Sequence, residues 1–300
     1  MSGRVGMLGV VLALQLAVAG VLLLTARGGG DAQGGPLLTF AAAEVDAIEL
    51  HDGAGQSVAL DRVGDGWQLA DGHPADAAKV TELLERLSAL EAAWPVATTA
   101  AAADRFEVSA DSHQRQLILR AGERTLADAY FGTSPGFQRV HARRADDEAV
   151  YSVALSNYQL PVSSNDWLDR TLLQPRGELT AVAREGEWAL SRSDEGWLLD
   201  GAAADQEAAA DLARRFSELR VSGVAAGLGD GFAAQGEFRL ADADGDYRLT
   251  LHADAAGDAF RLTSDRRDGV YELAAFVAEQ LLQEADGLRP GDAAASNLPP

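Results

Sequence analysis

The chain repeats part of its own sequence, and this internal duplication limits the fold more than any other feature. Residues 59–62 and 66–69 (ALDR and GWQL) match residues 189–192 and 196–199 (ALSR and GWLL) at a constant offset of 130. Two copies of roughly 100 residues each can bury separate hydrophobic cores, unlike short solenoid units. We therefore expect two tandem domains of the same fold.

Further matches follow in the same order along the chain. They pair Asp76, Leu83, Arg86 and Leu90 with Asp205, Leu212, Arg215 and Leu219 at offset 129, Phe106, Leu117 and Leu119 with Phe238, Leu249 and Leu251 at offset 132, and Val150–Tyr151 with Val270–Tyr271 at offset 120. The fall from 132 to 120 predicts a deletion in the second copy, opposite residues 126–136.

Each copy combines strand and helix signals. Alternating apolar and polar residues between Gly/Asp turns predict antiparallel hairpins with one buried face. Asp76 and Asp205 are predicted N-caps of amphipathic helices that cover these sheets. Later strands are predicted over residues 116–120, 126–131, 139–143 and 150–153, and over 247–252, 260–263 and 270–273. The expected class is α+β, with two duplicated domains, each a mainly antiparallel sheet with a packed helix.

An apolar run near the N-terminus predicts a transmembrane helix. Residues 5–24 contain Gln15 as their only strongly polar side chain, and twenty helical residues span about 30 Å, the hydrocarbon thickness of a bilayer. Ala17–Ala19 resembles a signal-peptidase site, but the apolar residues continue beyond it, which favours an uncleaved signal-anchor. Both interpretations export the remaining chain, so we expect a single-pass protein of the bacterial inner (cytoplasmic) membrane with extracytoplasmic domains.

These signals divide the chain into five parts. The predicted parts are a signal-anchor at 1–27, a Gly-rich tether at 28–36, a first α+β repeat at 37–175, a shorter second repeat at 176–286 and a disordered tail at 287–300. The tether is glycine-rich, and the tail has too few apolar residues to bury a core.

The chain is strongly acidic and contains no cysteine. Its 46 acidic and 25 basic residues give a net charge of −21, which repels phosphate backbones and argues against a nucleic-acid partner. Without cysteine, disulfides, thiol catalysis and thiolate metal sites are excluded. The expected membrane contact is with lipid, through residues 5–24.

Several motifs together resemble the DUF4340 family. The resemblance covers roughly residues 40–219 and rests on residues 45–50 (VDAIEL), Gly66–Trp67, the predicted helix at 76–90, Val150–Tyr151 and residues 165–173 (NDWLDRTLL). It implies a membrane-anchored bacterial protein, in some members an auxiliary subunit of gliding-motility-type ABC transport systems, without established catalytic residues. This chain has no nucleotide-binding motif, so an ATPase would be a separate polypeptide.

Signals for chemistry are sparse. The five histidines form no zinc-binding motif and are expected at the surface or at strand edges. Residues 242–246 (DADGD) suggest calcium ligands, but Tyr247 and Ala253 stand where an EF-hand needs glycine and glutamate. A hairpin turn is therefore preferred there. We predict no catalytic, cofactor-binding or metal-binding residues and no enzyme activity.

The sequence predicts three candidate residues for an interdomain or partner contact: Trp167, Asp169 and Arg170. They lie between the two copies, and residues 163–166 (SSND) can cap a short helix before Trp167. The tryptophan can wedge the repeats together, which we favour, or present an aromatic anchor to a partner.

Three classes of function follow from these features. The expected function is that of a non-catalytic accessory subunit of an ABC-type transport assembly, with membrane proteins of that complex as partners. The alternative is a ligand- or polymer-binding protein displayed on the membrane, which needs a sizeable apolar pocket between the two copies. An enzyme is the third class and would need clustered, perturbed titratable groups.

Overall fold

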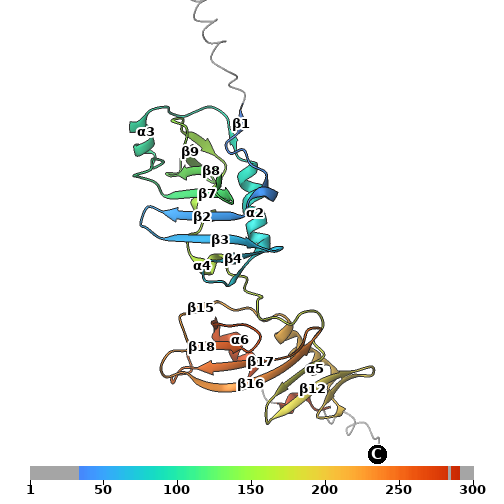
Figure 1. Ribbon diagram of the computed structural model, residues 1–300. Helices are drawn as coiled ribbons and strands as arrows, with labels where there is room; N and C mark the ends of the chain where they lie inside the picture. Colours follow the sequence, from blue (N-terminus) through green and yellow to red (C-terminus); the bar gives the residue numbers. More distant parts are fainter. Residues whose placement is uncertain (1–33, 283–284, 291–300) are drawn as a thin grey trace, which may run out of the picture. The chain divides into compact units, whose positions relative to one another are not determined.

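The computed structural model describes residues 34–282 and 285–290 (Figure 1). The predicted anchor, most of the predicted tether and the last ten residues of the predicted tail lie outside these ranges. Among the helices within them, none has both the length and the apolar character needed to cross a membrane.

The described chain forms two compact units. Unit 1 contains the described residues up to Arg62 together with Ala78–Ser163, and unit 2 contains Val63–Ala77 together with the described residues from Ser164 onward. Unit 2 thus includes the hairpin at 66–75, which pairs with residues 168 and 169 and also forms the end of the first sheet described below.

The first sheet has eight strands, with its helix packed beside β2 and β3 (Figure 1). Ile48 and Leu50 are buried while their strand neighbours are less so, as expected for a sheet with one face in a core. The order is β10-β9-β8-β7-β2-β3-β4-β5, formed by β2 (Ala47–Asp52), β3 (Ser57–Val63), β4 (Gly66–Leu69), β5 (Pro74–Ala75), β7 (Arg115–Ala121), β8 (Arg124–Phe131), β9 (Val140–Arg144) and β10 (Tyr151–Val153).

Shorter elements complete this part of the chain. Helix α2 (Ala77–Ser88) begins directly after Asp76 and buries Val80, Leu83, Leu84 and Leu87, as expected for an amphipathic helix. The others are η1 (Ala42–Glu44), α3 (Ala100–Arg105), η2 (Asn157–Gln159), α4 (Ser164–Trp167), and β1 (Gly35–Pro36) paired with β6 (Glu91–Ala92).

The second sheet repeats this order and adds one strand. Its order is β14-β13-β12-β11-β16-β17-β18-β19-β15, formed by β11 (Ala181–Arg184), β12 (Trp188–Ser193), β13 (Gly196–Leu199), β14 (Ala202–Ala203), β15 (Gly223–Ala225), β16 (Ala233–Asp242), β17 (Gly245–Ala253), β18 (Phe260–Ser264) and β19 (Val270–Leu273). Its helices are α5 (Gln206–Ser217), α6 (Ala275–Leu281) and η3 (Ala285–Leu288). Every strand of the first sheet has a counterpart in the second, and the mainly antiparallel α+β class is confirmed.

The register of the sheets corrects one of the sequence matches. In the first sheet Leu119 pairs with Ile48, and in the second sheet Leu240 pairs with Val182. Since Ile48 and Val182 hold the same position in their strands, Leu119 corresponds to Leu240 at offset 121, and the match to Leu251 at offset 132 is wrong by one strand. The deletion therefore lies between the main helix and β7 or β16, where the first copy has β6 and α3, and not opposite residues 126–136.

The folded region also continues past the predicted boundary at residue 286. Leu288 is buried, and its carbonyl oxygen accepts a hydrogen bond of 2.8 Å from the Asp205 N–H. At the other end, Leu37 and Leu38 are buried directly after β1. Leu37, Leu38 and Leu288 thus contribute to the hydrophobic cores, although they lie at or next to the segments predicted as tether and tail.

Asp205 caps helix α5 as predicted. Its carboxylate accepts a hydrogen bond of 3.0 Å from the Ala208 N–H, one of the amides that a helix leaves unsatisfied. We expect Asp205→Ala to lower the free energy of unfolding by about 1 kcal/mol. Urea denaturation checks this, and Asp205→Asn, which retains a capping oxygen, should restore most of the loss.

Candidate functional site

The predicted contact residues close the first repeat. Trp167 is the last residue of α4 and is fully buried. Its carbonyl oxygen accepts a hydrogen bond of 2.7 Å from the Asp76 N–H, and the Asp169 N–H donates to the Pro74 carbonyl oxygen at 2.9 Å. The segment 167–169 thus binds the β5 edge through main-chain bonds, and the indole lies in a core rather than on the surface.

The second repeat ends in the same way. There the Asp205 N–H donates to the Leu288 carbonyl oxygen, as the Asp76 N–H does to that of Trp167. Residues 166–168 (DWL) and 286–288 (DGL) match at offset 120, one residue out of step with the hydrogen bond, which pairs Trp167 with Leu288 at offset 121. The segment after α4 is therefore the conclusion of one repeat as well as the connection to the next.

Asp169 and Arg170 differ from Trp167 in exposure. The Asp169 carboxylate accepts hydrogen bonds from the N–H and the hydroxyl of Thr171, at 2.9 and 2.6 Å, and so fixes a local turn. Arg170 is exposed, and its carbonyl oxygen accepts a hydrogen bond of 3.0 Å from the Val221 N–H. Of the three residues, Arg170 has the side chain most accessible to a partner.

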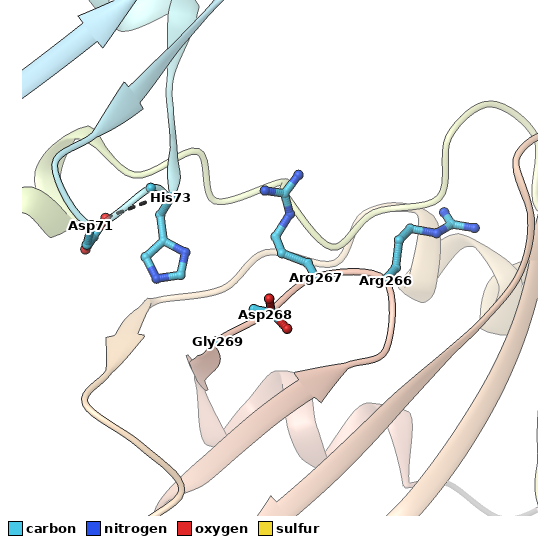
Figure 2. Close-up of a pocket in the computed structure, with 7 residues that line it drawn as sticks. Asp71, His73, Arg266, Arg267, Asp268 and Gly269 are labelled. Carbon is cyan, nitrogen blue, oxygen red and sulfur yellow. Dashed lines mark hydrogen bonds between the residues drawn. The ribbon is translucent and has the colours of Figure 1, made fainter. Parts of the chain in front are cut away.

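A polar pocket lies in unit 2, between two turns far apart in sequence (Figure 2). Its volume is about 600 Å³. One wall is the turn between β4 and β5, and the other is the turn between β18 and β19; together they contribute Asp71, Gly72, His73, Arg266, Arg267, Asp268 and Gly269. Apart from two glycines, every lining residue carries a charged or imidazole side chain.

His73 is held in the pocket by Tyr271. The Tyr271 hydroxyl donates to the Asp268 carbonyl oxygen at 2.8 Å and lies 3.2 Å from His73 Nδ1. Because the hydroxyl proton is already used, Nδ1 must donate to the hydroxyl oxygen, which leaves Nε2 of the neutral imidazole as an acceptor. Burial raises the pKa of Tyr271, so the hydroxyl stays protonated.

Gly269 allows this close contact. A Cβ at this position would lie 2.8 Å from His73 Cε1 and 3.0 Å from the Tyr271 hydroxyl oxygen, and its φ is +121°. Any other residue would push the imidazole away and strain the turn. The pocket is thus shaped by local backbone geometry.

The two arginines of the pocket have different roles. Arg266 forms a bidentate ion pair with the buried Asp242 carboxylate at 2.6 and 3.0 Å, and its guanidinium lies over the Tyr247 ring at 3.7 Å. Figure 2 shows it turned away from His73, with Arg267 and Asp268 nearer to the imidazole. Within residues 34–282 and 285–290, the Arg267 side chain makes no hydrogen bond or ion pair, so its charge is free for a ligand.

The DADGD segment forms the predicted hairpin turn. Asp242 pairs with Gly245 at the end of β16 and β17, and its carboxylate accepts from the Arg176 N–H at 2.7 Å and the Asp244 N–H at 2.9 Å. Together with Arg266, these donors hold the pKa of Asp242 at about 2. The carboxylate is a structural anion that fastens the turn.

One histidine departs from the expected surface location. His141 is buried in β9, which lies between β8 and β10 and is not an edge strand. Its ring stacks on Phe106 at 4.0 Å and its Nδ1 lies 2.9 Å from the Thr133 carbonyl oxygen. Burial lowers its pKa and favours a neutral, structural imidazole.

The pocket residues were not predicted from the sequence. Asp71–Gly72 and Asp268–Gly269 are ordinary turn dipeptides, and nothing local distinguishes them from other turns of the chain. Only the pairing of residues 167–169 with β5 and the contact of His73 with Tyr271 bring the two turns together.

Comparisons with known proteins agree with the resemblance described above. The model of the family described as Domain of unknown function (DUF4340) matches residues 67–249, from β4 of the first sheet to β17 of the second. No curated protein and no solved structure matches the chain. Because the family match covers more than half of its residues, this chain belongs to the DUF4340 family.

Proposed function

We propose that this protein is a non-catalytic, membrane-anchored accessory subunit of an ABC-type transport assembly, with both sheets on the extracytoplasmic side of the bacterial inner membrane. The predicted anchor at 5–24 and the DUF4340 resemblance support this location and role. The structural observation that carries the proposal is a group of exposed aromatic side chains at one edge of the first sheet.

Three aromatic residues of unit 1 form this group, which we call the aromatic edge: Trp94, Phe137 and Tyr158. Their exposed fractions are 70%, 89% and 73%. Exposed aromatic side chains contribute strongly to binding when a partner covers them, because they are large, rigid and partly polar. All three belong to unit 1.

All three segments are bonded to the strand at the end of the sheet, β10, or to its neighbours. The Val96 N–H, two residues after Trp94, donates to the Val150 carbonyl oxygen at 2.7 Å. In the loop that contains Phe137, Arg139 Nε donates to the Ser152 hydroxyl at 2.9 Å. Asn157, beside Tyr158, donates to the Gly132 carbonyl oxygen at 2.9 Å, at the start of that same loop. The three aromatic residues thus lie on segments that hydrogen bonds join to β10 and to the loop before β9.

Affinity purification tests this function. From membranes, the full-length chain should recover an ABC permease or its ATPase, identified by mass spectrometry, whereas the triple variant Trp94→Ser, Phe137→Ser, Tyr158→Ser should lose them while remaining folded. Phe276→Ser is the matched control, since Phe276 is 67% exposed in unit 2. Recovery of no transport component by the wild type, or equal recovery by the triple variant, would contradict the proposal.

The proposed orientation has its own test. A C-terminal alkaline phosphatase fusion is active only when exported, so the fusion should be active in intact cells. An inactive fusion that is expressed at full length would refute the extracytoplasmic placement.

The pocket favours a second function, the binding of a small ligand by unit 2. Its volume of about 600 Å³ lies in the range of small-molecule sites, roughly 300–1,000 Å³. Ligand binding by unit 2 is compatible with the role of an accessory subunit in a transport assembly.

A further inference from the structure

From the charges and hydrogen bonds of the pocket in unit 2, we infer that it binds a small zwitterion, an α-amino carboxylate or a short peptide. The carboxylate of the ligand pairs with Arg267, and its ammonium group with Asp268 and Asp71. This inference deepens the second function proposed above and is independent of the aromatic edge.

The charge of the pocket selects a ligand with both signs. Asp242 neutralises Arg266, which leaves one cation, Arg267, and two anions, Asp71 and Asp268, among the lining residues. A plain anion is repelled by the two carboxylates, and a plain cation leaves Arg267 without a partner. A molecule that carries both charges pairs with both walls.

These charged groups line one pocket from two turns. Asp71 lies in one turn with His73, and Arg267 and Asp268 lie in the other. The Tyr271 hydroxyl, which donates to the Asp268 carbonyl oxygen, lies 3.2 Å from His73 Nδ1 and links the two turns. A small ligand that fills this space can contact both signs of charge at once.

His73 adds a directional contact. Its Nδ1 donates to Tyr271, and Nε2 is left to accept a hydrogen bond from an ammonium or amide N–H. Because the Asp71 carboxylate accepts from the His73 backbone N–H at 3.1 Å, the turn is fixed before any ligand binds. Such preorganisation reduces the entropy cost of binding.

A metal ion is a poorer fit to the same residues. Within residues 34–282 and 285–290, no three His, Asp or Glu side chains come close enough to hold one. Hard cations require several oxygen ligands at short distances. The guanidinium of Arg267 on the pocket wall also opposes a bare cation.

Calorimetric titration with glycylglycine tests the inference. The full-length chain in detergent should bind this dipeptide more tightly than N-acetylglycine, which lacks the cation, and glycinamide, which lacks the carboxylate. Arg267→Gln and Asp268→Asn should each weaken binding about tenfold or more, since each removes a charge-assisted contact. Arg214→Gln is the control, because Arg214 is exposed on α5 outside the pocket, and it should bind as the wild type does.

Two results would overturn the inference. One is the absence of binding heat with glycylglycine at roughly 10 mM, the affinity range of the weakest specific ligands. The other is equal affinity for the three probes, or no loss in the Arg267 and Asp268 variants. Should a variant fail to fold, the His73 ring resonances of the wild type must still shift on addition of glycylglycine. None of these measurements depends on membrane partners, so failure here leaves the accessory function standing, and the reverse also holds.

Discussion

Replacing Trp167 by alanine should lower the free energy of unfolding by about 3–5 kcal/mol, the usual cost of removing a large aromatic side chain from a core. The indole is fully buried at the end of α4. Its segment also holds the β5 edge through the bonds to Pro74 and Asp76. Loss of the side chain leaves a cavity and loosens these bonds, and urea denaturation followed by circular dichroism measures the effect.

Trp94→Ala is the matched control for this experiment. It deletes the same side chain from a position that is 70% exposed, where substitutions usually change stability by less than about 0.5 kcal/mol. Its loss should instead appear in partner recovery. If the two variants were equally stable, the indole of Trp167 would not contribute to the core.

Strands and helices could be predicted from the sequence because local patterns determine them. The alternation in Leu117 and Leu119 or in Leu249 and Leu251 marks strands wherever one face is buried. Asp205 could be identified as a cap because the carboxylate acts within three residues of its own position. Each of these signals is complete within a short stretch of chain.

The same alternation explains the error in matching the two copies. Every half-buried strand carries leucine or another apolar residue at every second position, so β7 resembles β17 as well as its true counterpart β16. Hydrogen-bond register distinguishes them, since Leu119 faces Ile48 and Leu240 faces Val182. Register depends on a strand from elsewhere in the chain and is not visible locally.

The pocket and the aromatic edge depend on the same kind of distant information. His73 and Tyr271 are separated by 198 positions, and neither turn has an unusual composition. Trp94, Phe137 and Tyr158 could be read as core residues from composition alone, and their exposure follows only from how the segments bond to β10. Sequence patterns indicate where a residue stands in its own element, whereas a site depends on which elements meet.

Asp242→Asn should lower the free energy of unfolding by about 3 kcal/mol at neutral pH, because it leaves the half-buried Arg266 without its anion. The Asp242 side chain is fully inaccessible, and its two oxygens accept from Arg266 as well as from the amides of Arg176 and Asp244. An amide in its place presents an NH₂ group to one of these donors. Denaturant unfolding at pH 7 gives the magnitude.

The pH dependence of stability identifies the charge as the cause. The pKa of Asp242 falls from 3.8 to about 2 on folding, so the folded state binds its proton less readily than the unfolded state. The resulting stabilisation, about 2 kcal/mol from the size of this shift, is fully present above the unfolded pKa and is lost as the pH falls through about 2. The difference between wild type and Asp242→Asn should therefore shrink progressively between about pH 5 and pH 2.

Asp194→Asn is the control for destabilisation by the overall positive charge that the protein gains in acid. Asp194 is exposed on the turn after β12. This variant should follow the wild type at every pH, while the Asp242 variant approaches it only in acid. A constant difference across the whole range would mean that the amide disturbs packing and that the ion pair with Arg266 is not the source of the stability. Convergence near pH 2 would show that the turn between β16 and β17 is held by the ionised Asp242 carboxylate, which pairs with Arg266.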